Sequence, residues 1–309
     1  LQRAGIAIHE YRASEINKYA IAISKYNYPK IQHIGDVTDV TSEEHRDIDL
    51  LIGGSPCQGF SNIGTRLNFD DPRSKLFFEY VRLLLEIKPT YFLLENVVMK
   101  QEWQDIITHY LDVSPILINS SLVSAQNRRR LYWTNIPNVD QPEDKEIPLE
   151  RIIFSDAHIP ALFKRNKFKE TRPRVYHQKS PALVQASGGD HIPSLIYKPA
   201  VIDWMNKITK DGKRSHWDYH HHSDIKKGKS ATITANFYKL YPMNLLIANN
   251  CIRQFHPIEC ERLQTMPDNF TKFGIFDDTI KKISKTQRFN AIGNAWTVDV
   301  IAHIFSHME

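Results

Sequence analysis

Cysteine is scarce in this chain of 309 residues, with three copies at Cys57, Cys251 and Cys260. Three scattered cysteines exclude a disulfide framework and lack the spacing of a zinc motif. We therefore expect the protein in a reducing, intracellular compartment, the cytoplasm. Also missing is any run of about 18 apolar residues, so we expect no transmembrane helix and no membrane partner. The N-terminus has no charged-then-apolar leader, so nothing predicts secretion.

A strong excess of either charge is absent as well. The net charge of +5 and the pI near 8.9 exclude a histone-like tail, yet they permit nucleic acid as a partner. Hydrophobic residues make up 41% of the chain and charged residues 24%. This is the balance of an ordinary globular protein with a true core. The length favours one large domain or two ordinary ones.

The first 136 residues alternate between strand and helix patterns. This alternation predicts an α/β fold, with a doubly wound, mostly parallel sheet. Residues 137–250 are rich in Pro, Lys, His and Asn and have little helical period, so we expect a smaller, irregular, β-rich domain there. Residues 251–309 bring back two helices, one beginning near Pro257 and one over residues 295–308, the last of which should return to the first domain. The strands expected in the first part are 10–14, 31–36, 49–52, 90–94, 116–123 and 131–136, and the helices are 17–27, 73–88 and 101–111.

Polar residues follow successive predicted strands at the point where each one ends. Glu15 and Asp36 follow the first two strands, Cys57 follows the third in GGSPCQGFSN, and Glu95-Asn96 follow the fourth. Ligands of open α/β sheets bind outside the carboxyl ends of the strands, which lie about 5 Å apart. A tight turn explains the glycines and the proline around Cys57 but not the thiol. A buried structural thiol and a helix-capping carboxylate remain the alternatives for Cys57 and Glu95.

Six blocks of sequence carry a resemblance to a known family. They are GGSPCQGFSN, DDPRSKLFFE, ENVV, QNRRRLYW, IRQFHPIECERLQTMPDNF and FNAIGNAWTVDVI. In this order they resemble the motifs of the cytosine-C5 DNA methyltransferases of bacteria and phages. The resemblance implies a Rossmann-like domain that binds S-adenosyl-L-methionine and, over residues 137–250, a target-recognition domain.

The resemblance also implies a covalent mechanism on a cytosine flipped out of duplex DNA. Cys57 would be the nucleophile that attacks C6, because thiolate combines availability at neutral pH with high nucleophilicity toward carbon. Glu95 would protonate N3 with a raised pKa, and Asn96 would fix its loop. Arg130 would steady the site and Arg128 would contact the base or the cysteine loop. On an extended segment Arg129 points the other way.

The resemblance also implies which residues bind the cofactor. The expected DNA contacts add residues of the long polar loop after Cys57 and three residues that alternate on one strand face, Thr232, Thr234 and Asn236. The cofactor positions are Glu15, Ile16, Asp36, Val37, Pro56, Leu76, Asn294 and Ala295. The family's first motif, a Phe-x-Gly-x-Gly loop, is absent, and we expect that it precedes Leu1 in the whole protein. The positions expected at DNA are Gln58, Ser61, Gln126, Arg128, Thr232, Thr234 and Asn236. We expect no metal, because the triplet of residues 220–222 lacks ligand spacing.

The overall expectation is a monomeric DNA (cytosine-5-)-methyltransferase of a bacterial nucleoid or phage-infected host, used in restriction-modification beside a cognate restriction endonuclease. Two alternatives stay open. One is an RNA cytosine-C5 methyltransferase of the same family. The other is a catalytically inactive DNA-binding relative that lacks the cofactor loop.

Overall fold

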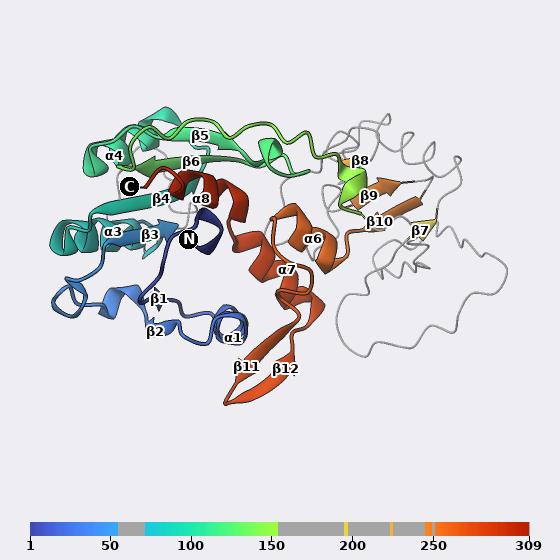
Figure 1. Cartoon of the computed structure of the whole chain (residues 1–309), viewed down its shortest axis with the longest axis horizontal. Helices are drawn as coiled ribbons and strands as arrows, with labels where there is room; N and C mark the ends of the chain where they lie inside the picture. The colour runs from blue at the N-terminus through green and yellow to red at the C-terminus, as the bar shows by residue number, and fades with distance from the viewer. Residues whose placement is uncertain (55–71, 154–194, 197–222, 225–244, 249–250, 309) are drawn as a thin grey trace.

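The computed structural model describes residues 1–54, 72–153, 195–196, 223–224, 245–248 and 251–308 (Figure 1). Its strands are β1 Arg12–Ser14, β2 Gln32–Gly35, β3 Leu50–Gly54, β4 Tyr91–Val97, β5 Ile116–Asn119, β6 Arg129–Thr134, β7 Leu195–Ile196, β8 Ser223–Asp224, β9 Leu245–Ala248, β10 Cys251–Gln254, β11 Phe273–Phe276 and β12 Thr279–Lys282. The α-helices are α1 Lys18–Asn27, α3 Pro72–Ile87, α4 Gln101–Leu111, α6 Pro257–Leu263, α7 Lys285–Asn294 and α8 Val298–Phe305, with short 3-10 helices η1 Gln2–Ala4, η2 Val37–Asp39, η3 Glu43–His45, η4 Ser120–Leu122 and η5 Leu149–Arg151. In this described part no helix combines the length and hydropathy that a membrane crossing needs.

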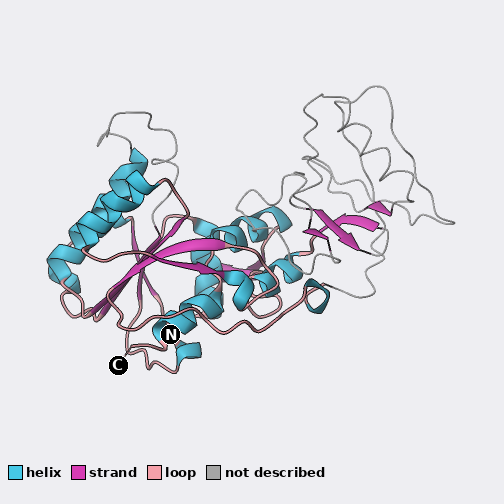
Figure 2. Ribbon diagram, turned by 90° about the horizontal axis from the view of Figure 1, so that it is seen from above, coloured by secondary structure: helices cyan, strands magenta, loops and turns pink. Residues whose placement is uncertain are grey.

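The central sheet has the strand order β3-β4-β6-β5 and helices on both faces (Figure 2). Successive side chains of a strand point to opposite faces. Accordingly, Phe92 and Leu94 of β4 pack with α3 and α4, whereas Leu93 packs on the other face with α8. All three are buried. By the same alternation Glu95 belongs to the α8 face of the sheet.

The sheet has one exception to the expected parallel arrangement, because β3, β4 and β5 run in the same direction and β6 runs opposite to them. β3 and β4 are parallel, but β6 runs antiparallel to both β4 and β5. Only residues 120–128 connect β5 to β6. A crossover to a parallel strand needs a dozen or more residues, so this connection makes an antiparallel pair. A separate two-stranded parallel sheet, β1-β2, carries the first two predicted strands.

A second core joins the C-terminal helices to the segment that follows β6. Leu149 and Ile153 pack with Phe255 of the chain before α6 and with Phe289 of α7. The backbone N–H of Lys145 donates to the carbonyl of residue 122 at 2.7 Å. Residues 137–153 therefore pack on the α/β part, whereas their sequence pattern predicts that they belong to the small domain. The limits of the recognition region beyond residue 153 stay a prediction, and the described strands β7 to β10 form one short four-stranded sheet.

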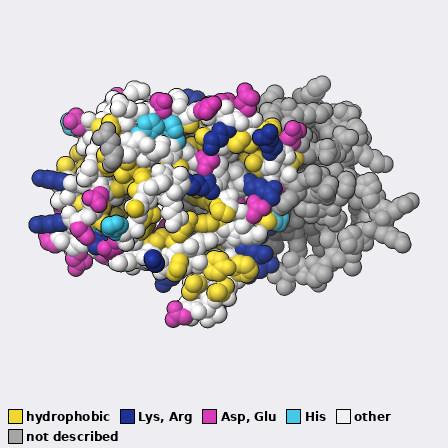
Figure 3. Space-filling view, in the orientation of Figure 1, with side chains coloured by type: hydrophobic (Ala, Val, Ile, Leu, Met, Phe, Trp, Pro, Cys, Tyr) yellow, Lys and Arg dark blue, Asp and Glu magenta, His cyan; other side chains and the backbone are white. Residues whose placement is uncertain are grey.

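The hairpin β11-β12 packs against α1 and was not predicted. Gly274 lies so close to Ala22 that a Cβ at Gly274 would be 2.9 Å from the methyl group of Ala22. Tyr19 and Tyr26 of α1 make ring contacts with phenylalanines of β11. Hydrophobic side chains gather over this hairpin at the bottom of Figure 3. Ile280 of β12 is 60% exposed.

Candidate active site

Glu95 is the buried carboxylate at the centre of the candidate site. It lies on β4 opposite Gly54, the last residue of β3, and 9% of it is exposed. Arg130 enters from β6, where it pairs with Val97, and its Nε lies 2.9 Å from Glu95 Oε1. Three strands thus bring the end of β3, the carboxylate and a guanidinium together at one edge of the sheet.

Burial raises the pKa of the Glu95 carboxyl, because removal from water disfavours the charged form. The positive charges of Arg130 and Arg128 and a hydrogen bond from Trp296 oppose that shift without cancelling it. Despite the short ionic contact with Arg130, Oε1 has no well-aligned hydrogen-bond donor among the described residues. A buried carboxyl with a raised pKa is suited to exchange a proton with a ligand.

The three arginines of QNRRR alternate as the sequence predicts. Arg128 is buried, Arg129 is exposed, and Arg130 contacts Glu95. Arg128 donates through Nη2 to the carbonyl of Ala295 at 3.2 Å. Its burial, together with the positive charge of Arg130, lowers its pKa to about 10. Two guanidinium groups therefore surround one carboxylate, while the middle one faces solvent.

The junction between α7 and α8 closes the site from the other side. Trp296 hydrogen-bonds to Glu95, and its Nε1 is 3.4 Å from the point where a Cβ on Gly54 would lie. Gln264 holds this junction, since its Nε2 donates to the carbonyls of Ile292 and Ala295. Sequence reasoning missed both Trp296 and Gln264 as site residues. The only signal was that both lie inside the two C-terminal motif blocks.

Gln126 and Asn96 lie inside the protein rather than at its surface. Gln126 is fully buried and donates through Nε2 to the carbonyl of Leu263 at 3.0 Å and to Gln264 at 3.2 Å. In this conformation the side chain of Gln126 therefore exposes no surface that could contact DNA, because its amide already binds the end of α6. Asn96 is buried as well, and its Oδ1 accepts from the next backbone N–H, that of Val97, at 2.8 Å.

The two glycines that end β3 have different reasons to be there. A Cβ on Gly53 would lie 2.5 Å from Cδ2 of Tyr80, a buried residue of α3. A Cβ on Gly54 would instead meet Trp296 at 3.4 Å and Oε2 of Glu95 at 3.6 Å. Gly53 lets α3 approach the sheet, and Gly54 keeps the space beside Glu95 free of a side chain.

Two carboxylates follow the paired strands β1 and β2. Ser14 pairs with Gly35, so Glu15 and Asp36 are the next residues on neighbouring strands. Glu15 Oε1 accepts from the two backbone N–H groups that follow it, both at 2.8 Å. Asp36 Oδ1 caps η2 through the backbone N–H and the hydroxyl of Thr38, which lowers the pKa of Asp36. In this part of the structure the second oxygen of each carboxylate has no described hydrogen-bond donor.

The other residues predicted to bind a cofactor lie near these carboxylates or at the helix ends. Ile16 directly follows Glu15 and is 73% exposed, which is unusual for an isoleucine. Val37 is half-buried after Asp36. Leu76 is half-buried on α3, Asn294 is the exposed last residue of α7, and Ala295 is half-buried directly after it. Ile16 therefore leaves an apolar side chain exposed directly after Glu15.

Several predicted residues lie outside the described part of the chain. These are Pro56, Cys57, Gln58, Ser61, Thr232, Thr234 and Asn236. Of the three cysteines, Cys251 begins β10, and Cys260 is entirely buried in the core around α6. Burial raises the pKa of its thiol well above the ordinary value, so Cys260 is no source of thiolate.

Comparisons with known proteins cover the whole chain. The family model for C-5 cytosine-specific DNA methylases matches residues 1–309. The type II methyltransferase M1.ScrFI of Lactococcus lactis subsp. cremoris is 29% identical over 96% of this chain and 71% of its own length. The orphan methyltransferase M.SPRI of Bacillus phage SPR is 35% identical over 44% of this chain and 34% of its own length.

Two solved structures share the fold. The S. pombe Dnmt2 methyltransferase has a TM-score of 0.62 at 17% identity and covers 99% of this chain and 92% of its own. The Entamoeba histolytica methyltransferase EhMeth has a TM-score of 0.64 at 15% identity and covers 95% of this chain and 88% of its own. At these identities the likeness establishes the α/β architecture.

Proposed function

Because the chain belongs to the C-5 cytosine-specific DNA methylase family, we propose that Cys57 and Glu95 together catalyse methylation of carbon 5 of cytosine in DNA. The observation that carries the proposal is the environment of Glu95, which is buried, has a raised pKa and lies 2.9 Å from the guanidinium of Arg130. The methyl donor of this family is S-adenosyl-L-methionine, which supplies an electrophilic methyl group when bound.

Cys57 is proposed as the nucleophile. β3 ends at Gly54 beside Glu95, and Cys57 is the third residue after it. Three residues of chain span at most about 11 Å, so the thiol is tethered within reach of the carboxyl. The thiolate forms a bond to C6 of the cytosine, and the electron pair of the C5–C6 double bond moves into the ring. Carbon 5 thereby becomes nucleophilic enough to accept the methyl group.

Glu95 is proposed as the proton donor to N3. Its burial keeps the carboxyl protonated at higher pH than an exposed glutamate, so a proton is available when charge builds on the ring. Once the proton has left, the carboxylate remains beside Arg130 and near Arg128, whose charges stabilise it. A base then removes the C5 proton, the C6–S bond breaks, and Glu95 recovers its proton.

Glu15, Asp36 and Ile16 are proposed to hold the cofactor. The free oxygen of Glu15 suits the ribose hydroxyls, the free oxygen of Asp36 suits the adenine amino group, and the exposed side chain of Ile16 suits the face of the ring. The family fold and these unused acceptors support the assignment. Pro56, Val37, Leu76, Asn294 and Ala295 are proposed to complete this binding site.

Contacts with DNA are proposed for Gln58, Ser61, Thr232, Thr234 and Asn236, with Arg128 against the flipped base. Gln126 is proposed to support the site from within, given its bonds to the end of α6. A recognition domain between residues 154 and 250, a monomeric state, a bacterial or phage-infected cell and a cognate restriction endonuclease complete the proposal.

The direct test is methyl transfer from labelled S-adenosyl-L-methionine to mixed-sequence duplex DNA by the full-length protein. The proposal expects label in 5-methylcytosine, competed by duplex DNA and not by tRNA. Competition by tRNA alone would favour the RNA enzyme. Absence of label from a folded protein that binds the cofactor would defeat the proposal.

A further inference from the structure

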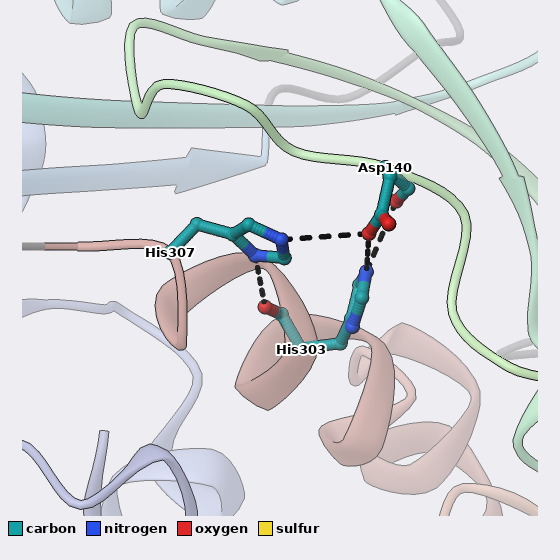
Figure 4. Close-up of side chains that lie close together, drawn as sticks. All are labelled: Asp140, His303 and His307. Atoms are coloured by element: carbon teal, nitrogen blue, oxygen red, sulfur yellow. Dashed lines mark hydrogen bonds and ion pairs between the residues drawn. The ribbon is translucent and has the colours of Figure 1, made fainter.

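Asp140, His303 and His307 bring three metal-type ligand atoms together on the outer side of α8. These atoms lie within 4.8 Å of one another (Figure 4). His303 is in the last turn of α8, His307 is one turn further along, and Asp140 comes from the segment after β6. The two imidazole rings lie 4.9 Å apart and are nearly perpendicular. None of the three residues has a role in the chemistry at Glu95.

The hydrogen bond of His307 determines which of its ring nitrogens has no hydrogen. Its Nδ1 lies 2.9 Å from the carbonyl oxygen of His303. A carbonyl only accepts, so Nδ1 carries the hydrogen, and Nε2 of the neutral ring presents a lone pair. That Nε2 lies 3.4 Å from Asp140 Oδ1, which is also an acceptor. A divalent cation placed between two acceptors at this distance would satisfy both.

The two distances to Asp140 Oδ1 match those expected in a tetrahedral metal centre. His303 Nε2 lies 3.2 Å from the same carboxylate oxygen. It also lies 3.0 Å from the backbone carbonyl of Asp140, so by the same reasoning it carries the hydrogen in the metal-free ring, and a bound ion would replace that hydrogen. Metal–ligand bonds of about 2.0–2.1 Å at tetrahedral angles place two ligand atoms about 3.3 Å apart. The observed separations of 3.2 and 3.4 Å fall on either side of that value. In addition, the bond from His307 Nδ1–H to a carbonyl is the orienting contact typical of metal-bound histidine.

We propose that Asp140 Oδ1, His303 Nε2 and His307 Nε2 bind one divalent transition-metal ion of the zinc type, with water as the fourth ligand. Two imidazoles and one carboxylate suit Zn²⁺, Ni²⁺ or Cu²⁺ better than Mg²⁺ or Ca²⁺. The ion would cross-link α8 to the segment of residues 137–153. That segment already binds α8 through Lys145 Nζ, 3.3 Å from Asp299 Oδ2. The site is structural, because it joins two elements that pack on the sheet.

The test is calorimetric titration of the chelator-treated, full-length protein with Zn²⁺. The sequence carries three consecutive histidines at 220–222, so the titration uses a background in which all three are asparagine. We expect one Zn²⁺ ion bound per chain in this background. His303→Asn and His307→Asn should each weaken binding at that site by at least about tenfold. Zn²⁺ should raise the Tm of the background protein and not that of the two variants.

Two further variants make the outcome unambiguous. His109→Asn removes an exposed histidine from the last turn of α4 and should leave Zn²⁺ binding unchanged. Asp140→Asn alters a carboxylate whose side chain is 75% exposed, so it should fold normally and still weaken binding. Unchanged stoichiometry and affinity in His307→Asn would overturn the proposal. Absence of Zn²⁺ binding by the background protein would also overturn it.

Discussion

Replacing Gly53 with alanine should destabilise the protein through a collision between β3 and α3. The new Cβ would lie 2.5 Å from Tyr80 Cδ2 and 2.7 Å from Cε2, whereas carbon atoms in contact normally stay about 3.5–4.0 Å apart. Tyr80 is 7% exposed and packed in the core with Phe77 and Leu94, so its ring has no free space to move into. Overpacking of this kind costs about 1–3 kcal/mol of unfolding free energy.

Chemical denaturation measures that cost, and the neighbouring glycine is the matched control. In Gly54→Ala the new Cβ meets Trp296 at 3.4 Å and Glu95 at 3.6 Å, which are ordinary contacts. Its unfolding free energy should stay within about 0.5 kcal/mol of the wild type, although methyl transfer should fall because the methyl group lies against Glu95. Both variants share the same gain in backbone propensity, so their difference isolates the collision.

A double-mutant cycle completes the test. In a Tyr80→Ala background the collision partner is gone, and Gly53→Ala should then cost less than about 0.5 kcal/mol. Equal unfolding free energies for wild type and Gly53→Ala, or an equal loss in both backgrounds, would refute the close approach of α3 to the end of β3.

Three more predictions concern charged residues, two in the candidate active site and one in the core around α6 and α7. Glu95→Gln should lower the rate of methyl transfer about 10²–10⁴-fold, and it should abolish the fall in rate that the wild type shows as pH rises through the raised pKa of Glu95. Arg130→Gln should move that alkaline limb to higher pH in pH–rate profiles, because Arg130 holds the pKa of Glu95 down; an unmoved limb would assign it to another group. Glu261→Gln should cost about 3–5 kcal/mol in denaturation experiments, since it leaves buried Arg288 without its partner 2.8 Å away. Asp268→Asn breaks an exposed ion pair and should cost less than about 1 kcal/mol; similar losses in both would contradict the importance of burial.

Local signals in the sequence predicted most of the elements around the site. The helix predicted from Asn17 begins as expected, because Asn17 is the N-cap of α1. Its side chain accepts hydrogen bonds from two backbone N–H groups. Pro257 begins α6 as expected, with His256 and Glu259 forming a capping box. The period of residues 73–88 matches α3 within one residue at each end. These features depend on neighbours along the chain, which is why a single sequence shows them.

Contacts between distant segments could not be predicted in the same way. The pairing of Arg130 with Val97 requires β6 to run antiparallel to β4, and alternation of strands and helices favoured the opposite direction. The hydrogen bond from Trp296 to Glu95 depends on how α7 and α8 cross the sheet edge, which no local period encodes. The sequence also could not separate the two possible roles of Asp36. In the structure one of its carboxylate oxygens caps η2, as a turn residue would, while the other oxygen remains available to a ligand.

The account depends most on covalent attack by the sulfur of Cys57. A duplex with 5-fluorocytosine at the target traps the adduct, because fluorine replaces the proton that must leave C5. With S-adenosyl-L-methionine present, the wild-type protein should form one complex that resists denaturation, and Cys57→Ala should form none while it still binds DNA. An equal yield of the trapped complex from Cys57→Ala would contradict the account.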